Sequence, residues 1–302
     1  MPDHPRTKKL VLKRLAWKLA RIVVVAYIGL AIVLALLQTQ LIFPGASTQG
    51  SADARVHPEQ LGAELLILTT PAGEKVAALF GGALDEAGLP RTDAKSRPTL
   101  LYFYGNGMCM ADCESEFRSF RRRGFNVMVP DYLGYGMSGG KPSEPGVYAT
   151  ADACFDHLKQ RGDVDPRRIV PVGWSLGGGA AFHLAATRDE IPCVVTVSAF
   201  TSMDEMARKM FPYLPTSMIL QHHFDNESKV QKIRRPVFLA HGTRDGIIPF
   251  AMSKTLAAAA AASGSTVVKY DVEDGDHNDV FDMGGTGLLD AISDFVNAHA
   301  GR

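Results

Sequence analysis

Cysteine is scarce in this chain, since only four of its 302 residues are cysteines. No two of them form the C-x-x-C pair that is typical of zinc sites, and the sequence implies no metal and no organic cofactor. Cys109 and Cys113 are close enough in sequence to form a disulfide in an oxidising compartment. The alternative is that these cysteines, with Cys154 and Cys193, are small buried thiols.

Net charge is also absent, because 32 basic residues balance 32 acidic ones. Outside the N-terminus no basic face with interleaved aromatic residues is found, so we predict no nucleic-acid partner. Hydrophobic residues make up 46% of the chain and charged residues 21%, which allows a sizeable core to be buried. The composition leaves the oligomeric state open.

A long uncharged run lies near the N-terminus. Residues 22–37 carry no charged side chain, and the run extends through Gln38, Thr39 and Gln40 to residue 43. About 20 apolar residues span a bilayer core, so this run is long enough if its polar end enters the interface. Basic residues precede it at Arg6, Lys8, Lys9, Lys13, Arg14, Lys18 and Arg21.

We therefore predict a basic N-terminus and a single-pass membrane anchor over residues 1–45. No clear small-x-small cleavage site follows the run, which favours an uncleaved anchor. A cleaved signal peptide and a buried core helix are the alternatives. The basic flank favours a cytoplasmic N-terminus, which would put the rest of the chain on the non-cytoplasmic side.

Residues 46–302 are expected to form one domain of the α/β class. A turn signal at Pro71-Ala72-Gly73 separates two short strands, and farther on, strand-length apolar runs alternate with helix-length segments. This alternation predicts a doubly wound, mostly parallel sheet with an antiparallel start. The strands are expected at 65–70, 75–80, 99–104, 126–129, 168–172, 194–198, 237–240 and 266–272. Helices are expected near 113–123, 146–160, 176–187, 250–262 and 288–298.

Two segments need separate comment. Pro171 lies inside an expected central strand, where its missing N–H predicts a local bulge. Residues 200–235 separate two strands and are long enough for a small helical cap. That segment is rich in methionine and other apolar residues, which form either an acyl pocket or the core of the cap.

A candidate nucleophile lies in Gly173-Trp174-Ser175-Leu176-Gly177, a G-x-S-x-G motif between an apolar strand and an alanine-rich helix. In that setting the serine occupies a strained turn that lifts its hydroxyl clear of the sheet. The helix behind it presents the positive end of its dipole to an oxyanion. We therefore predict Ser175 as the nucleophile.

A serine hydroxyl needs a base, and His277 and Asp245 are the candidates for base and acid. They lie in the loops after the last two expected strands, so both should reach the carboxyl edge of the sheet, where sites in such folds form. Asp245 would hold the imidazole tautomer. Asp276 is an alternative acid, although it adjoins His277, and His241 is expected to end a buried strand.

The oxyanion would be held by the backbone N–H groups of Leu176 and Asn106, with Met108 as a less favoured donor. A second motif, the G-x-G-x-x-G string at residues 134–139, is typical of dinucleotide sites only where it opens directly into a helix. Here Pro142 and Pro145 interrupt, so we interpret the glycines as a tight loop behind Ser175.

Taken together, these motifs resemble the membrane-anchored branch of the ABHD-type α/β-hydrolases, from the anchor to the C-terminus. The resemblance differs at Tyr104, where histidine is usual, and at Leu133, where arginine is usual. It implies hydrolysis of a small-molecule or lipid-like acyl ester, thioester or amide through an acyl-enzyme. A non-catalytic, membrane-tethered binding protein is the alternative from another class. The resemblance is carried by residues 40–44, 104–107, 131–139, 142–144, 173–178, 224–226, 241–245 and 275–278.

Overall fold

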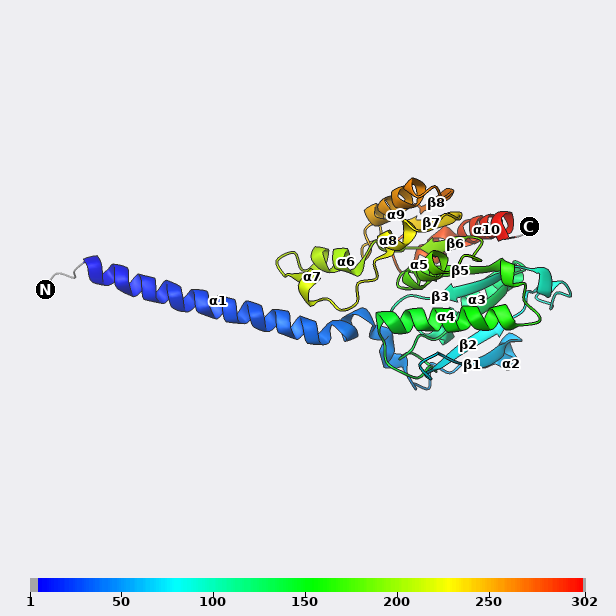
Figure 1. Cartoon of the computed structure of the whole chain (residues 1–302), viewed down its shortest axis with the longest axis horizontal. Helices are drawn as coiled ribbons and strands as arrows, with labels where there is room; N and C mark the ends of the chain where they lie inside the picture. The colour runs from blue at the N-terminus through cyan, green and yellow to red at the C-terminus, as the bar shows by residue number, and fades with distance from the viewer. Residues whose placement is uncertain (1–4, 301–302) are drawn as a thin grey trace.

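The N-terminal helix stands apart from the rest of the chain. The computed structural model describes residues 5–300, with the side chains of Leu10 and of residues 12 onward, so the side chains of Arg6, Lys8 and Lys9 lie outside it. Helix α1 (Pro5–Ile42) projects from the domain (Figure 1). Its part Leu12–Ile42 is long and apolar enough to cross a membrane, a test of length and composition that a signal sequence also passes.

The domain is built on one eight-stranded sheet in the order β1-β2-β4-β3-β5-β6-β7-β8. β2 pairs antiparallel with β1 and β4, and every other pair is parallel, as the sequence predicts. The strands are β1 (Glu64–Thr69), β2 (Lys75–Gly81), β3 (Thr99–Phe103), β4 (Asn126–Pro130), β5 (Ile169–Trp174), β6 (Val194–Val197), β7 (Val237–Gly242) and β8 (Val267–Val272).

Helices cover both faces of this sheet. Strand order runs from β3 to β4 in one direction and from β4 towards β8 in the other, so right-handed crossovers put α3 on one face and α4, α5 and α9 on the other. α10 shares the face of α3, to which the Arg123–Asp290 ion pair (2.9 Å) joins it. The bounds are α3 (Glu114–Arg122), α4 (Glu144–Gln160), α5 (Gly177–Thr187), α9 (Phe250–Ala262) and α10 (Val280–Ala300), the last kinked at Gly285; short helices are α2 (Pro58–Leu61), α6 (Met203–Met210), α7 (Thr216–Ile219) and α8 (Asn226–Val230).

Pro171 does not produce the bulge that its position predicts. The register between β3 and β5 is continuous through the pair Leu101–Pro171, and β5 pairs with β6 only from Val172 onward. The missing N–H of Pro171 therefore interrupts no pairing with β6. The proline is accommodated because it lies one residue before the second ladder begins.

Residues 200–235 divide into two parts. Helices α6 and α7, with the loop between them and Leu220, extend beyond the sheet alongside α1, and we call residues 203–220 the cap (Figure 1). Helix α8 instead packs between α5 and α9. The cap is fastened to α1 by the Gln38 amide, whose Nε2 donates to the Ile219 carbonyl (3.0 Å) and whose Oε1 accepts from the Gln221 N–H (2.7 Å).

Candidate functional site

The turn between β5 and α5 holds Ser175 in an unusual backbone conformation. Its φ is +55°, in the left-handed region that non-glycine residues rarely adopt, and its N–H donates to the Val197 carbonyl (2.9 Å). A side chain on Gly173 would lie 2.2 Å from the Gly177 carbonyl oxygen, so the motif needs glycine there. The serine is therefore held on a strained turn at the carboxyl end of a central strand.

Three loops bring the predicted triad residues together. The Ser175 Oγ lies 2.9 Å from His277 Nε2, and His277 Nδ1 lies 2.8 Å from an Asp245 carboxylate oxygen. All three side chains are buried. Because a carboxylate only accepts, the Nδ1–H donates to Asp245, and Nε2 is left to accept from the serine hydroxyl. This is the geometry of a nucleophile, a base and an orienting acid.

The Asp245 carboxylate is fully occupied by donors. Its Oδ1 accepts from the N–H groups of Ile247 (2.9 Å) and Ile248 (2.7 Å), and its Oδ2 accepts from His277. Burial alone would raise the pKa of Asp245, but the hydrogen bonds from His241 and His277 outweigh it and hold that pKa well below its ordinary value. Asp245 is therefore ionised at neutral pH.

His241 takes part in this network, which the sequence analysis did not foresee. It lies in β7, at the expected end of a buried strand, and its Nε2 is 2.9 Å from the Ile248 carbonyl oxygen and 3.2 Å from Asp245 Oδ2. An N–H there donates to both oxygens, so His241 and His277 contact the same oxygen of Asp245. The four-residue spacing between His241 and Asp245 is the signal in the sequence that was available.

Asp276, the alternative acid, has other partners. Its Oδ1 accepts from the N–H groups of Gly246 and His277, both at 2.7 Å. These two hydrogen bonds lower the pKa of Asp276. The carboxylate thus joins the loop of Asp245 to the loop of His277, which fixes the distance between acid and base.

The predicted oxyanion loop, residues 104–108, lies beside the serine. The site where a Gly105 Cβ would stand is 3.6 Å from the Ser175 Cβ, and Asn106 and Leu176 both line the cavity in front of the serine. The Met108 N–H donates to the Gly105 carbonyl (3.4 Å), which favours Asn106 over Met108 as the donor from this loop.

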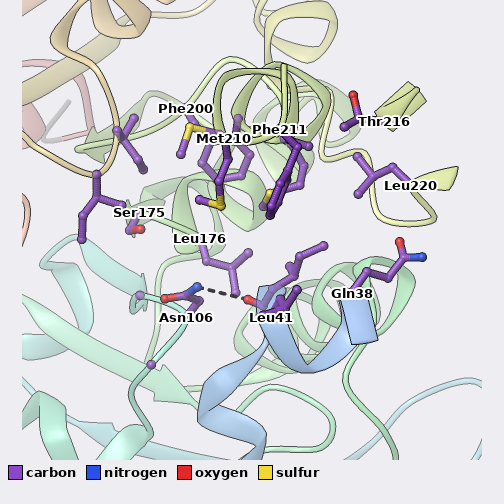
Figure 2. A pocket seen from close by; sticks show the side chains of 18 of the residues that line it. Gln38, Leu41, Asn106, Ser175, Leu176, Phe200, Met210, Phe211, Thr216 and Leu220 are labelled. Atoms are coloured by element: carbon purple, nitrogen blue, oxygen red, sulfur yellow. Dashed lines mark hydrogen bonds between the residues drawn. The ribbon is translucent and has the colours of Figure 1, made fainter. Parts of the chain in front are cut away.

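The end of α1 and the glycine-rich loop hold Asn106 in place. Its side-chain amide donates to the Ile42 carbonyl (3.1 Å), drawn as a dashed line in Figure 2. Its own carbonyl accepts from the Gly45 N–H (2.9 Å) and the Tyr135 hydroxyl (3.0 Å). Residues 134–139 therefore form a turn that supports the oxyanion loop through Tyr135, whereas from the sequence we expect a tight loop behind Ser175.

Tyr104 and Leu133, the two residues at which the chain departs from the family pattern, both make buried contacts. The Tyr104 hydroxyl donates to Asp131 Oδ1 (2.9 Å), and the Met137 N–H donates to the other oxygen (2.7 Å). Burial raises the pKa of Asp131. Tyr104 thus ties the oxyanion loop to the glycine-rich loop through a buried carboxyl group, while Leu133 is buried with its N–H donating to Thr150 (3.1 Å).

A cavity of about 590 Å³ opens in front of Ser175 and His277. Figure 2 shows α1 on one side of it and the cap on the other. The α1 side chains that line it are Leu34, Ala35, Gln38, Leu41 and Ile42, and those of the cap include Met203, Met206, Met210, Phe211 and Leu214. Three of the four methionines of residues 200–235 therefore line a cavity, one of the two roles considered for them, while Met218 is exposed.

In the part of the chain that the structure describes, no cysteine side chain lines this cavity. Cys109, Cys113, Cys154 and Cys193 are all free and buried. Within the described residues no group of three or more histidine, cysteine, aspartate or glutamate side chains converges to hold a metal ion.

Comparison with known proteins gives consistent relatives. The alpha/beta hydrolase fold family matches residues 98–219. The chain is 34% identical to the uncharacterized protein Rv2307c of Mycobacterium tuberculosis over 76% of this chain and 81% of that protein. It is 32% identical to alpha/beta hydrolase domain-containing protein 17B of Xenopus tropicalis over 62% of this chain and 60% of that protein.

A solved structure supports the same fold. The esterase Pf2001 of Pyrococcus furiosus superposes with a TM-score of 0.65 at 18% identity, over 82% of this chain and 95% of the esterase. The predicted doubly wound α/β architecture is thereby confirmed. The chain therefore belongs to the α/β-hydrolase family and is related to the alpha/beta hydrolase domain-containing (ABHD) proteins, as the sequence resemblance implies.

Proposed function

We propose that the protein is a serine hydrolase that cleaves acyl esters or thioesters through an acyl-enzyme intermediate. The observation that carries this proposal is the continuous chain of hydrogen bonds from Ser175 Oγ through His277 to Asp245. Ser175, at one end of this chain, faces a largely apolar cavity. A nucleophile without such a base is a weak one.

In the proposed reaction His277 Nε2 takes the proton of Ser175 as Oγ attacks the carbonyl carbon. Asp245 stabilises the imidazolium that forms. The N–H groups of Leu176 and Asn106 donate to the oxyanion, and removal of one such donor typically costs about 3 kcal/mol of transition-state stabilisation. His277 then protonates the leaving alkoxide or thiolate, and a water that it deprotonates attacks the acyl-enzyme and restores Ser175.

The cavity supports an acyl chain as the group that is transferred to serine. Its walls are leucine, isoleucine, methionine and phenylalanine side chains, which bind hydrocarbon without selecting a polar group. An amide or peptide substrate remains the alternative with the same triad, and the rates on matched ester and amide substrates separate the two.

We also propose that α1 stays attached as a membrane anchor. Ile42 and Phe43 are buried in the domain, and Gln38 is buried with its amide bonded to the cap. Cleavage beyond residue 43 would remove these contacts together with one wall of the cavity. The basic flank supports a cytoplasmic N-terminus and a domain on the non-cytoplasmic side.

Labelling with a fluorophosphonate probe tests the nucleophile. The purified full chain should be labelled, and Ser175→Ala should not be, because the probe bonds only to an activated hydroxyl. Hydrolysis of p-nitrophenyl esters of rising chain length should then show an optimum set by the cavity. A folded wild-type chain that takes no label would favour the non-catalytic binding protein.

The ionisation of Asp245 gives a pH prediction. Its folded-state pKa lies below the unfolded value of about 3.9, so the stability that it contributes is full above about pH 5 and is lost as the pH falls below about 4. The difference in free energy of unfolding between wild type and Asp245→Asn should shrink over that range. Denaturant titrations at pH 7 and pH 3.5 measure it, and an unchanged difference would contradict the hydrogen bonds assigned to the Asp245 carboxylate.

Gly45 gives a test of the oxyanion loop. A Cβ there would lie 2.3 Å from the Tyr135 ring and 2.7 Å from the Asn106 carbonyl oxygen, so Gly45→Ala should displace the loop. We expect kcat to fall by roughly tenfold or more with a smaller change in KM. Gly29→Ala is the matched control, since a Cβ at Gly29 meets no atom within 4 Å. Equal kcat values in the two variants would argue against the loop's role.

Topology is tested by cysteine labelling of intact cells. The four native cysteines are buried, so Asp53→Cys, at an exposed position just after the anchor, supplies the reactive thiol. An impermeant maleimide should label it from outside. Labelling only in inverted vesicles would reverse the proposed orientation.

A further inference from the structure

The tip of the cap contacts α1 far from the domain. The Tyr27 hydroxyl donates to the Tyr213 carbonyl (2.8 Å), and Tyr27 precedes Ile42, the last residue of α1, by 15 positions. At 1.5 Å per residue the contact lies about 22 Å along the helix axis from the domain. The cap therefore runs beside α1 rather than over the sheet (Figure 1).

This stretch of α1 belongs to its uncharged part. Residues 22–42 hold no charged side chain, and 21 helical residues span about 31 Å, close to the hydrocarbon thickness of a bilayer. The cap contacts α1 at Gln38 and at Tyr27, both within this segment. If the segment crosses the membrane, the cap therefore lies at the depth of the lipid hydrocarbon chains.

The cap tip has the surface that such a position needs. Residues 210–220 contain no charged side chain, and Tyr213 and Met218 are 88% and 84% exposed. On α1 itself, Leu36 is 73% exposed and Leu37 and Leu41 are also exposed. Arg208 and Lys209, which precede the tip, have stems long enough to return their charges to the headgroups.

The backbone of the tip is also largely satisfied from within. The N–H groups of Phe211, Leu214, Thr216, Met218 and Leu220 donate to carbonyls of residues 207–216, and Pro212 and Pro215 have no N–H to satisfy. The Tyr213 and Ile219 carbonyls accept from α1 side chains. Internal pairing of this kind lowers the cost of leaving water.

We propose that residues 210–220 insert into one leaflet of the bilayer beside α1. The cavity between these residues and α1 then receives the acyl chain of a membrane lipid directly from that leaflet. The second half of this proposal rests on the proposed hydrolase function. The cavity follows the seam: Leu34 and Leu41 of α1 face Met210, Leu214 and Ile219 of the cap. Leu34 lies about 12 Å along the axis from Ile42, whose carbonyl binds Asn106 beside the serine.

Depth measurement tests the insertion without any need for activity. The full chain carrying Met218→Cys is labelled with the fluorophore NBD and reconstituted into phosphatidylcholine vesicles with brominated acyl chains. The buried native thiols should not react. Asn297→Cys is the control, because Asn297 is exposed near the end of α10. The C-terminal end of α10 lies on the far side of the domain from α1 (Figure 1).

Bromine should quench the label at position 218 several-fold more than the label at 297. Equal quenching at the two positions would overturn the insertion. The same measurement on the Ser175→Ala background gives the same answer whether or not the chain is a hydrolase, so failure of the insertion and failure of the proposed function are distinguishable.

Lipid access is tested by Met218→Asp, since Met218 is exposed and does not line the cavity. An aspartate at position 218 would be costly to place in the lipid hydrocarbon, so it should oppose insertion of the cap. Hydrolysis of a long-chain ester embedded in vesicles should then fall about tenfold or more. Hydrolysis of a water-soluble short ester should be unchanged, which also reports a folded chain. Leu89→Asp is the control. Leu89 is 62% exposed and lies in the loop between β2 and β3, away from the carboxyl edge of the parallel strands. This variant should hydrolyse both esters at the wild-type rate.

Two results would overturn lipid access. A Met218→Asp variant that hydrolyses both esters at the wild-type rate would show that insertion is not needed for catalysis on membranes. An equal loss on both esters would assign the effect to folding or to the catalytic groups, and not to the path of the acyl chain.

Discussion

The left-handed backbone of Ser175 is the constraint on which the centre of the molecule depends. It requires Gly173, where any side chain would meet the backbone of α5, and Gly177, where a Cβ would lie 2.1 Å from the Phe103 carbonyl oxygen. Because α5 packs so closely on the end of β3, the loop that follows Phe103 lies beside the serine. One strained residue thus brings the proposed nucleophile and the proposed oxyanion loop to the same place.

A second level of organisation joins the domain to α1. The Gln38 amide donates to the Ile219 carbonyl of the cap and accepts from the N–H of Gln221, just after the cap, and Asn106 bonds to the Ile42 carbonyl. Phe43 is fully buried and packs edge-on against His222 (5.0 Å between ring centroids). The C-terminal end of α1 therefore belongs structurally to the domain, and farther along the helix the Tyr27 hydroxyl bonds to the cap.

Much of the fold follows from local sequence. Strand-length apolar runs and the strand–turn–helix setting of Ser175 are local signals, and the topology of a doubly wound sheet then brings the loops of Asp245 and His277 to one edge. The bulge predicted at Pro171 was wrong, because the sequence does not tell where pairing with a second neighbour begins. That depends on the relative lengths of β5 and β6.

Long-range contacts could not be predicted in the same way. Gln38 appeared as a polar residue at the interfacial end of an apolar run, and its partners lie some 180 residues away in the chain. His241 appeared as the end of a buried strand, and its second role depends on how the Asp245 loop folds back towards it. No periodicity encodes such contacts, since they depend on the packing of complete elements.

The shared use of α1 links two selective pressures. Leu34, Gln38, Leu41 and Ile42 belong both to a helix that is long and apolar enough to cross a membrane and to the wall of the cavity. A substitution that adapts the helix to a thicker or thinner membrane therefore reshapes the cavity as well. If α1 is the anchor that we propose, membrane thickness and the shape of the cavity would change together during divergence of such proteins.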